Sequence, residues 1–185
     1  MVVLKNICKS FNGKEVLRDV SATFRDGITC VMGASGVGKT TLVNIVAGIV
    51  VADSGEISGT ENKKISVVFQ EDRLLEWETA LTNVLFVNPD KERAVELLTQ
   101  AGLSENLHKK TAELSGGMKR RVCLCRALIS EHDILILDEP FKGLDNEIKT
   151  SIMQMVKDCE KCITICITHD ESEAKFLGGE IMIIS

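Results

Sequence analysis

The sequence contains no hydrophobic run long enough to cross a membrane, which takes about 18 to 20 consecutive apolar residues in a helix. Its longest apolar runs, among them Ile134–Leu137 and Ile181–Ile184, have the length of β-strands. We expect no signal peptide at the N-terminus, because Lys5 and Lys9 are not followed by an apolar stretch. We therefore expect a cytoplasmic protein that acts on a membrane only through a partner.

The chain also lacks an excess of positive charge. It has 22 Lys and Arg against 27 Asp and Glu, a net charge of −5, which argues against broad non-specific binding to nucleic acid. A local basic cluster, Lys119-Arg120-Arg121, remains a site of contact in principle. A solvated helix face is the better interpretation of that cluster.

The cysteines lack the arrangement of a complete zinc site. Cys159-Glu160-Lys161-Cys162 has the spacing of half such a site or of a redox pair, but no second Cys-X-X-Cys or His pair accompanies it. An odd number of cysteines, several inside strand-like runs, favours reduced and packed thiols. The seven are Cys8, Cys30, Cys123, Cys125, Cys159, Cys162 and Cys166.

What is present is a chain of 185 residues, enough for one domain that buries about 70% of its surface. Val2–Phe11 and Lys14–Phe24 read as strands joined at Asn12-Gly13, a strong hairpin signal. Apolar strands then alternate with helices, which predicts a mostly parallel sheet covered on both faces. The expected strands are Ile28–Met32, Ile65–Phe69, Ile134–Leu137, Ile163–Ile167 and Ile181–Ile184, and the expected helices are Lys39–Ile49, Gly117–Ser130 and Asn146–Cys159.

The stretch from about Asp72 to Lys110 is more polar and mostly helical in pattern. Within it Asn88-Pro89-Asp90 reads as N-cap, N1 and N2 of a helix Lys91–Ala101, with Gly102 as its stop. We therefore expect an inserted helical subdomain at about 72–125, between core segments 1–71 and 126–185.

The segment Gly33–Thr40, called the phosphate loop below, fits the pattern G-x-x-x-x-G-K-[ST]. Its glycines let successive backbone N–H groups point at phosphate oxygens, and the helix that follows adds its positive end. Lys39 is expected to reach the β- and γ-phosphates of ATP, and the Thr40 hydroxyl to ligate Mg²⁺. A strand before and a helix after supply the context that this pattern requires.

A pair of acidic residues follows the apolar run Ile134–Leu137. Asp138 and Glu139 come at the carboxyl end of that expected strand, where ligands bind in open α/β sheets. Asp138 is placed to hold Mg²⁺, and Glu139 to orient and deprotonate the attacking water. The alternative, that the two acids merely cap the next helix, loses weight beside a phosphate loop.

Leu114-Ser115-Gly116-Gly117-Met118, the signature segment below, offers a hydroxyl and glycine N–H groups at the start of a helix. Such a start is a second anion-binding end, which one nucleotide does not need from the same subunit. The surplus points to assembly with another subunit.

Together these segments resemble the ATP-binding cassette (ABC) ATPases over essentially the whole chain. The order is the phosphate loop, Gln70, the signature segment, Leu137–Pro140, Gly143-Leu144-Asp145 and His169. The resemblance implies an α/β fold of the P-loop NTPase type: a mostly parallel sheet core, an N-terminal antiparallel β-subdomain and an inserted helical subdomain.

The resemblance also implies roles for individual residues. Glu139, His169 and Lys39 would be catalytic, with His169 contacting the γ-phosphate, and Mg²⁺ would be held by Thr40, Gln70 and Asp138. A second copy, in a head-to-tail, ATP-dependent homodimer, would add Ser115, Gly116, Gly117 and Asp145 to the site. The implied ATP-binding set within one copy is Phe11 (stacked on adenine), Gly33, Ala34, Ser35, Gly36, Val37, Gly38, Lys39, Thr40, Thr41 and Gln70.

The stretch from Phe69 to Val84 is similar to that of bacterial importer ATPases for nitrate, sulfonate, taurine and related solutes. This implies permease subunits on separate chains, a solute-binding protein, and a place on the inner face of the cell membrane. Trp77 suits a permease contact, with a core position as the equal alternative. Departures from these importers are Glu76 for Pro, Phe11 for Tyr, Arg120 for Gln, and an earlier end of the chain.

Two other functions remain as alternatives: an efflux or lipoprotein-releasing ABC ATPase, and a soluble ABC ATPase outside transport. The insert is too short for the coiled coils of the DNA-repair members, and translation members usually carry two cassettes. The iron–sulfur assembly ATPase has a more acidic neighbourhood than Met118–Arg121. His108 and His132 match nothing in the family pattern.

Overall fold

The computed structural model describes residues 1–159 and 162–184. Glu160, Lys161 and Ser185 lie outside this part, so the middle of the expected Cys-X-X-Cys pair is not described. The chain divides into two compact units. The first, here the sheet unit, contains residues 1–67, 132–138 and 162–184, and the second, the helical unit, contains 68–131 and 139–159.

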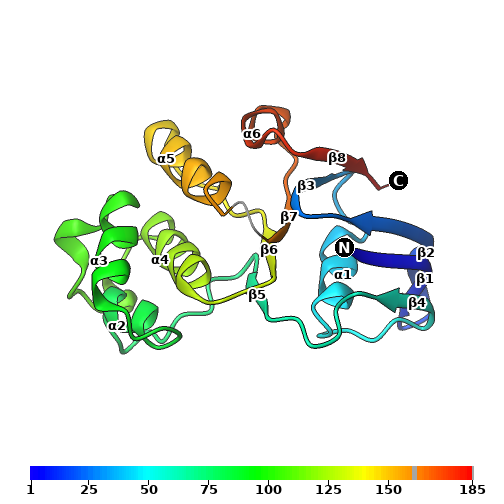
Figure 1. Cartoon of the computed structure of the whole chain (residues 1–185), viewed down its shortest axis with the longest axis horizontal. Helices are drawn as coiled ribbons and strands as arrows, with labels where there is room; N and C mark the ends of the chain where they lie inside the picture. Colours follow the sequence, from blue (N-terminus) through cyan, green and yellow to red (C-terminus); the bar gives the residue numbers. More distant parts are fainter. Residues whose placement is uncertain (160–161, 185) are drawn as a thin grey trace. The chain divides into compact units, whose positions relative to one another are not determined.

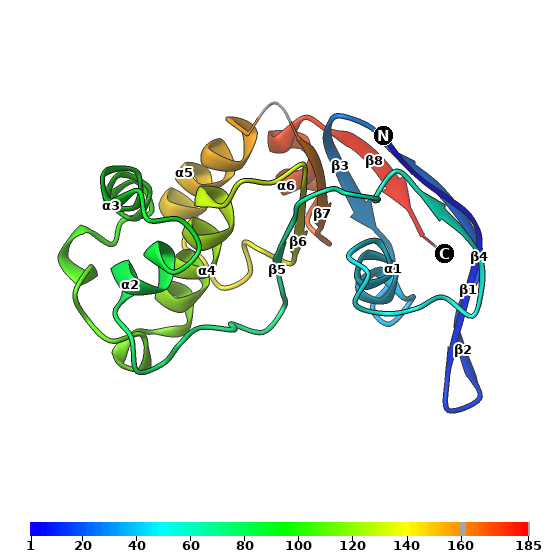
Figure 2. The same cartoon turned by 60° about the horizontal axis from the view of Figure 1, so that its bottom comes forward.

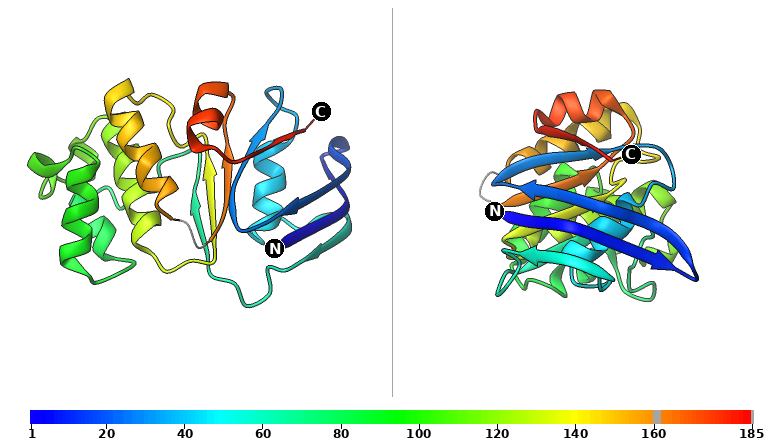
Figure 3. Two further views of the ribbon diagram at one scale, coloured as in Figure 1. Left: turned by 45° about the horizontal axis from the view of Figure 1, so that its top comes forward. Right: turned by 90° about the vertical axis from the view of Figure 1, so that its right-hand side faces the viewer.

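An antiparallel sheet opens the sheet unit, with strand order β2-β1-β4 (Figure 3, right). β1 (Val2–Phe11) and β2 (Lys14–Phe24) pair as a hairpin, and β4 (Ser54–Ser58) pairs with the other edge of β1. Asn12 and Gly13, at the hairpin turn, both have positive φ (50° and 78°), so the predicted turn is confirmed. β4 was not expected from the sequence.

The second sheet has the order β5-β6-β7-β3-β8, and its β6–β7, β7–β3 and β3–β8 pairings are parallel. Every residue of β6 and of β7 is buried, as a strand covered on both faces requires. α1 (Lys39–Val46) lies between the two sheets (Figure 1), and a short α6 (Glu171–Leu177), not predicted, precedes β8. The strands are β3 (Gly27–Met32), β5 (Ile65–Val68), β6 (Ile134–Asp138), β7 (Ile163–Ile167) and β8 (Glu180–Ile183).

The sheet unit is held by one aliphatic core that both sheets and α1 share. Leu4 and Leu17 from the hairpin, Leu42 from α1 and Ile165 from β7 are each at most 1% exposed. This core fixes the ends of β3, β6 and β7, which are the places where the predicted nucleotide-binding residues follow.

The helical unit packs α2, α3 and α4 as one group (Figure 2). Its elements are α2 (Ala80–Leu85), α3 (Lys91–Gln100), the 3₁₀ turns Ser104–Asn106 and Thr111–Glu113, α4 (Gly116–Ile129) and α5 (Asn146–Lys157). In the part of the chain described, none of the helices is long and apolar enough to span a bilayer.

The expected start of α3 is wrong by two residues. The N-cap is Asp90, whose Oδ1 accepts from the Arg93 N–H at 3.0 Å, rather than Asn88. Asn88 instead donates from Nδ2 to the Ile129 carbonyl and accepts from the Asp90 N–H, both at 3.0 Å. The Asn88 side chain, which the local pattern assigned to capping, is thus held by a tertiary contact with α4. Gly102, with φ 68°, ends α3 as predicted.

Candidate nucleotide-binding site

The phosphate loop runs from the end of β3 into α1, as the sequence pattern requires. Gly38 is the N-cap of α1 with φ 102°, and a Cβ added there would lie 2.6 Å from a Leu17 methyl carbon and 2.8 Å from the Val16 carbonyl oxygen. A Cβ on Gly33 would collide with the Ile184 carbonyl. Both positions therefore admit only glycine, and the loop's backbone stays free to face a ligand.

Lys39 closes the phosphate loop upon itself. Its Nζ donates to the Gly33 carbonyl at 2.9 Å and to the Ala34 carbonyl at 2.8 Å. The ammonium therefore lies at the loop, where the phosphates of a nucleotide would sit among the same backbone groups. Its contact with the β- and γ-phosphates stays a prediction.

Thr40 and Asp138 meet across 98 residues of sequence. The Thr40 hydroxyl donates to Asp138 Oδ2 at 2.8 Å, and Asp138 is only 4% exposed at the end of β6. A hydroxyl and a carboxylate oxygen side by side are donors that a hard cation such as Mg²⁺ prefers. The residues present therefore fit the predicted magnesium ion.

The strand beside β6 leads to another predicted site residue, His169. β7 ends at Ile167, the parallel partner of Asp138, and the exposed His169 follows two residues later. Thr168, 2% exposed, donates to the Glu173 carboxylate at 2.5 Å and accepts from the Asp170 N–H at 3.1 Å. Glu173 thus fixes the turn around His169. Sequence reasoning missed it because α6, which carries it, was not predicted.

Glu139 follows β6 directly and has an unusual backbone. Its φ of 47° is in the left-handed region, which costs a non-glycine residue of order 1–3 kcal/mol and is typical of functional sites. Its carboxylate accepts from Lys142 Nζ at 3.0 Å. No role was expected for Lys142 from the sequence.

The signature segment begins α4. Ser115 is the N-cap, and its Oγ accepts from the Met118 N–H at 3.3 Å. A Cβ added to Gly117 would lie 3.3 Å from the Gly143 carbonyl oxygen, so this glycine allows a close approach of the loop that precedes α5. Asp145 in turn caps α5 by accepting from the Ile148 N–H at 3.0 Å. The expected partner-facing residues therefore start two helices of the helical unit.

Gln70 is exposed in the segment between β5 and α2, and α4 holds its main chain. The Arg120 guanidinium donates to the carbonyls of Phe69 and Gln70, and its Nε lies 3.4 Å from an Asp72 carboxylate oxygen. Arg120 is 7% exposed, so the expectation of a solvated basic helix face is wrong for it. Carbonyls outside strands and helices need hydrogen-bond donors when they are buried, and the Arg120 side chain supplies these donors.

The other two residues of the basic cluster also have partners. Arg121 donates from Nη1 to the carbonyls of Ala101 and Gly102 at 2.7 and 3.1 Å, which satisfies the end of α3. Lys119 Nζ lies 3.6 Å from Glu76 Oε1. The cluster therefore serves contacts inside the helical unit.

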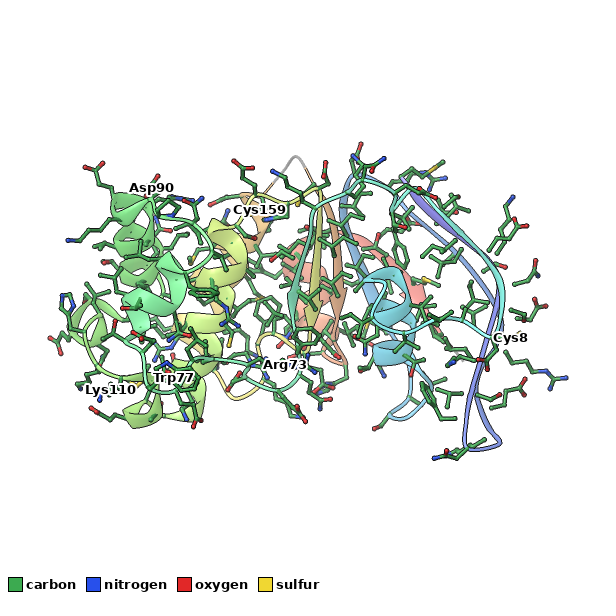
Figure 4. All side chains as sticks on the ribbon, turned by 90° about the horizontal axis from the view of Figure 1, so that it is seen from below. Cys8, Arg73, Trp77, Asp90, Lys110 and Cys159 are labelled. Carbon is green, nitrogen blue, oxygen red and sulfur yellow. The ribbon has the colours of Figure 1, made fainter. Side chains whose placement is uncertain are left out.

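Two aromatic side chains are exposed: Phe11, predicted to stack on adenine, and Trp77, predicted to contact a permease. Phe11 is 44% exposed, and Lys9 Nζ lies 5.2 Å from its ring centre. Trp77 is 68% exposed and lies in the segment that joins β5 to α2. Figure 4 labels Trp77 and, in the same segment, Arg73. The alternative that Trp77 is a core residue is therefore wrong.

Most of the cysteines are packed rather than reactive. Burial raises the pKa of Cys30 and of Cys123 to about 11 and that of Cys125 to about 12. The seven thiols are free, and no group of three or more metal-binding side chains occurs among the described residues.

Each unit therefore carries its own part of the predicted site. The sheet unit holds the phosphate loop with Lys39 and Thr40, together with Asp138 and His169. The helical unit holds the exposed Gln70 segment, Glu139, the signature segment and Asp145, the last two at helix starts.

A glycine loop between a buried strand and a helix, with a lysine on the loop and a carboxylate at the end of another strand of the same sheet, defines a P-loop nucleotide-binding protein. The model of the family "ABC transporter" matches residues 17–142 of the sequence. The chain belongs to the ABC transporter family.

Several curated relatives are similar over nearly the whole chain. The aliphatic sulfonates import ATP-binding protein SsuB 1 of Rhodococcus jostii (strain RHA1) is 36% identical over 98% of the chain and 78% of the relative. SsuB 1 of Agrobacterium fabrum is 35% identical over 97% of the chain and 69% of the relative. SsuB 2 of Pseudomonas syringae pv. syringae is 36% identical over all of the chain and 69% of the relative.

Solved structures agree with the fold. A dimeric structure of MJ0796, described as a bacterial ABC transporter cassette, has a TM-score of 0.89 at 29% identity and covers 100% of this chain and 94% of that one. A second dimeric structure, a post-hydrolysis state of the same cassette with ADP and Pi, has a TM-score of 0.87 at the same identity and coverage. The predicted family, fold class, nucleotide binding and ATPase activity are confirmed.

Proposed function

We propose that this chain is the ATP-binding and ATP-hydrolysing subunit of a bacterial ABC importer for a small solute. The relatives reported above are import proteins for aliphatic sulfonates, which makes that class the first solute to test. The observation that carries the proposal is the 2.8 Å contact between Thr40 and Asp138, because it joins the phosphate loop to the strand-end carboxylate.

ATP binds along the phosphate loop in this proposal. Backbone N–H groups of Gly33–Thr41 and the start of α1 surround the phosphates, and Lys39 exchanges its two carbonyl acceptors for phosphate oxygens. Phe11 stacks on the adenine, which the 44% exposure of this residue allows.

Thr40, Asp138 and Gln70 hold Mg²⁺, which when bound neutralises charge on the phosphates during transfer. Glu139 accepts the proton of the attacking water, and its pairing with Lys142 keeps this carboxylate oriented. His169 donates to the γ-phosphate from the turn that Thr168 and Glu173 hold.

Two copies bind head to tail, so that each supplies its helix starts to the nucleotide of the other. Ser115, Gly116, Gly117 and Asp145 are the residues that act across this interface. Their exposed or half-buried positions at the starts of α4 and α5 are compatible with the role, and both MJ0796 structures are dimers.

Closing and reopening of the dimer drives a permease formed by separate chains, at the cytoplasmic face of the membrane. Trp77, 68% exposed beside Glu76, is the first residue to test for permease contact, because aromatic side chains are enriched at the cores of interfaces. A solute-binding protein delivers the solute to that permease.

The test is Glu139→Gln, which keeps the size of the side chain and removes the base. We expect ATP binding to persist and turnover to fall by about 10²–10⁴-fold, the usual contribution of a general base. The variant with ATP should also form dimers in light scattering, because the nucleotide that holds the two copies together is not consumed.

Two variants make the comparison sharp. Glu92→Gln, at an exposed position on α3, controls for loss of a carboxylate and should behave as wild type. Lys39→Ala should lose ATP binding in calorimetry and with it the dimer. Normal turnover of Glu139→Gln would remove this residue from the base role, and a persistent monomer with bound ATP would refute the two-copy arrangement.

A further inference from the structure

Arg120 stands on α4, five residues after the Ser115 that begins the signature segment. Its side chain does not extend into water, because the residue is only 7% exposed. A guanidinium has five donor N–H groups and a permanent charge, so a buried one requires several acceptors. Among the described residues, the acceptors of Arg120 come from a single short segment, Phe69–Asp72.

Three groups of that segment face the guanidinium. Its two terminal nitrogens donate to the carbonyls of Phe69 and Gln70, and its Nε lies 3.4 Å from the carboxylate of Asp72, whose side chain is 22% exposed. The segment belongs to no strand or helix, so no backbone ladder pairs these carbonyls. Arg120 is therefore a main constraint on the main chain at Gln70.

Two further residues of the same helix continue the contact. Cys123 Sγ lies 3.9 Å from Asp72 Oδ1, and Arg126 donates to the carbonyl of Arg73. The guanidinium of Arg73 lies 3.7 Å from the ring centre of Phe69, so the segment is also tied to itself. Positions 120, 123 and 126 lie along one side of α4. The signature helix and the Gln70 segment are thus joined at three successive points.

We propose that Arg120 is a positioning residue. It fixes the main chain of Gln70 to α4, the helix that begins with the signature segment. In this way Arg120 sets how the Gln70 side chain meets Mg²⁺ and the γ-phosphate. The inference rests on the proposed function of Gln70. A glutamine at position 120 has one amide donor group and no charge, so it cannot satisfy two carbonyls and a carboxylate together. A lysine keeps the charge but loses the planar fork.

The experiment measures single-turnover hydrolysis of radiolabelled ATP with the full chain in excess, which detects slow turnover. Arg120→Gln should lower the rate about 10-fold, as expected when a contacting group is displaced, while ATP affinity stays within about twofold. The Mg²⁺ concentration for half-maximal rate should rise about 5-fold or more, because Gln70 would meet the ion less well. Arg120→Lys should recover part of the rate.

The deciding measurement is a double-mutant cycle with Gln70→Ala. If Arg120 acts through Gln70, adding Arg120→Gln to Gln70→Ala should change the rate by less than about twofold. A general loss of structure would instead multiply the two effects. Arg93→Gln is the matched control, because this arginine pairs with Glu96 on the exposed side of α3 and should leave the rate unchanged.

Asp72→Asn is the second variant, for use if Arg120→Gln folds poorly. It removes the ion pair but leaves the two carbonyl acceptors, so we expect a smaller loss of about threefold that also disappears in the Gln70→Ala background. An unchanged rate and Mg²⁺ requirement in Arg120→Gln, or full multiplication in the cycle, would overturn the proposal. Failure of the proposed function would appear in the wild-type chain itself, as absence of ATP turnover.

Discussion

The two units place their functional residues by different means. In the sheet unit β7 is hydrogen-bonded to β6 on one side and to β3 on the other, and all five of its residues are buried. In the helical unit the Phe69–Arg73 segment belongs to no strand or helix, and side chains of α4 hold its carbonyls.

This difference separates residue positions that should tolerate substitution from positions that should be sensitive to it. A residue at the end of a buried parallel strand keeps its place through the backbone ladder and aliphatic burial, which tolerate exchange of individual apolar side chains. A loop held by charged side chains depends on each of them. We therefore expect stability to be concentrated in the sheet unit and the tuning of activity in the contacts of α4.

The largest effect on stability should come from Ile165→Ala in β7. This side chain is fully buried between β6 and β3, so its removal should lower the free energy of unfolding by about 2–5 kcal/mol. Urea unfolding followed by circular dichroism measures it. Ile181→Ala, 52% exposed in β8, is the matched control and should cost clearly less. Equal losses in the two variants would contradict a core centred on β7.

A smaller effect is expected from Arg126→Gln in α4. The variant loses the donor to the Arg73 carbonyl, a change of about 1 kcal/mol in the free energy of unfolding. Arg93→Gln, which breaks an exposed pair with Glu96, should change it by less than about 0.5 kcal/mol. If the two variants unfold at the same urea concentration, the α4 contacts do not hold the segment.

The smallest effect concerns the order in which thiols react. A thiol is reactive as thiolate, so Cys123 with a pKa of about 11 and Cys125 with about 12 should stay protonated at pH 8 and react with iodoacetamide only after local opening. The half-buried Cys8 and Cys159 should be labelled first in mass spectrometry. Raising the pH towards 11 should speed labelling of Cys123.

The same labelling tests the comparison of the two units directly. Cys30 in β3 and Cys166 in β7 are fully buried in the sheet unit, and burial raises the pKa of both thiols. We expect them to react more slowly than Cys123, whose helix is held to an irregular segment. Labelling of Cys30 or Cys166 ahead of Cys123 would show that the sheet unit opens first.

The sheet unit could be predicted well because its signals are local. Ile163–Ile167 has the bounds expected from a buried apolar run, and Asn12-Gly13 forms the expected turn. β4 could not be predicted, since Ser54–Ser58 contains one apolar residue, Ile57, and becomes a strand only by pairing with β1. α6 was missed because seven residues rich in charge give little periodicity.

The helical unit contains tertiary contacts that could not be predicted from the sequence alone. The sequence shows that Arg120 replaces the usual glutamine of the importers. Its burial, however, depends on two carbonyls that no strand or helix pairs and that lie opposite α4 in space. The same holds for Asn88, which contacts Ile129 some 41 residues away instead of capping α3. The roles of the site residues in catalysis stay predictions, while their positions at strand ends and helix starts follow from the fold.

The double contact of Lys39 with the Gly33 and Ala34 carbonyls has a thermodynamic consequence. A phosphate loop that already has internal partners for its ammonium does not have to be ordered by the nucleotide. Binding then becomes an exchange of acceptors, with little conformational entropy lost from the loop. Calorimetry should accordingly find a heat-capacity change that reflects burial of the adenine rather than folding of the loop.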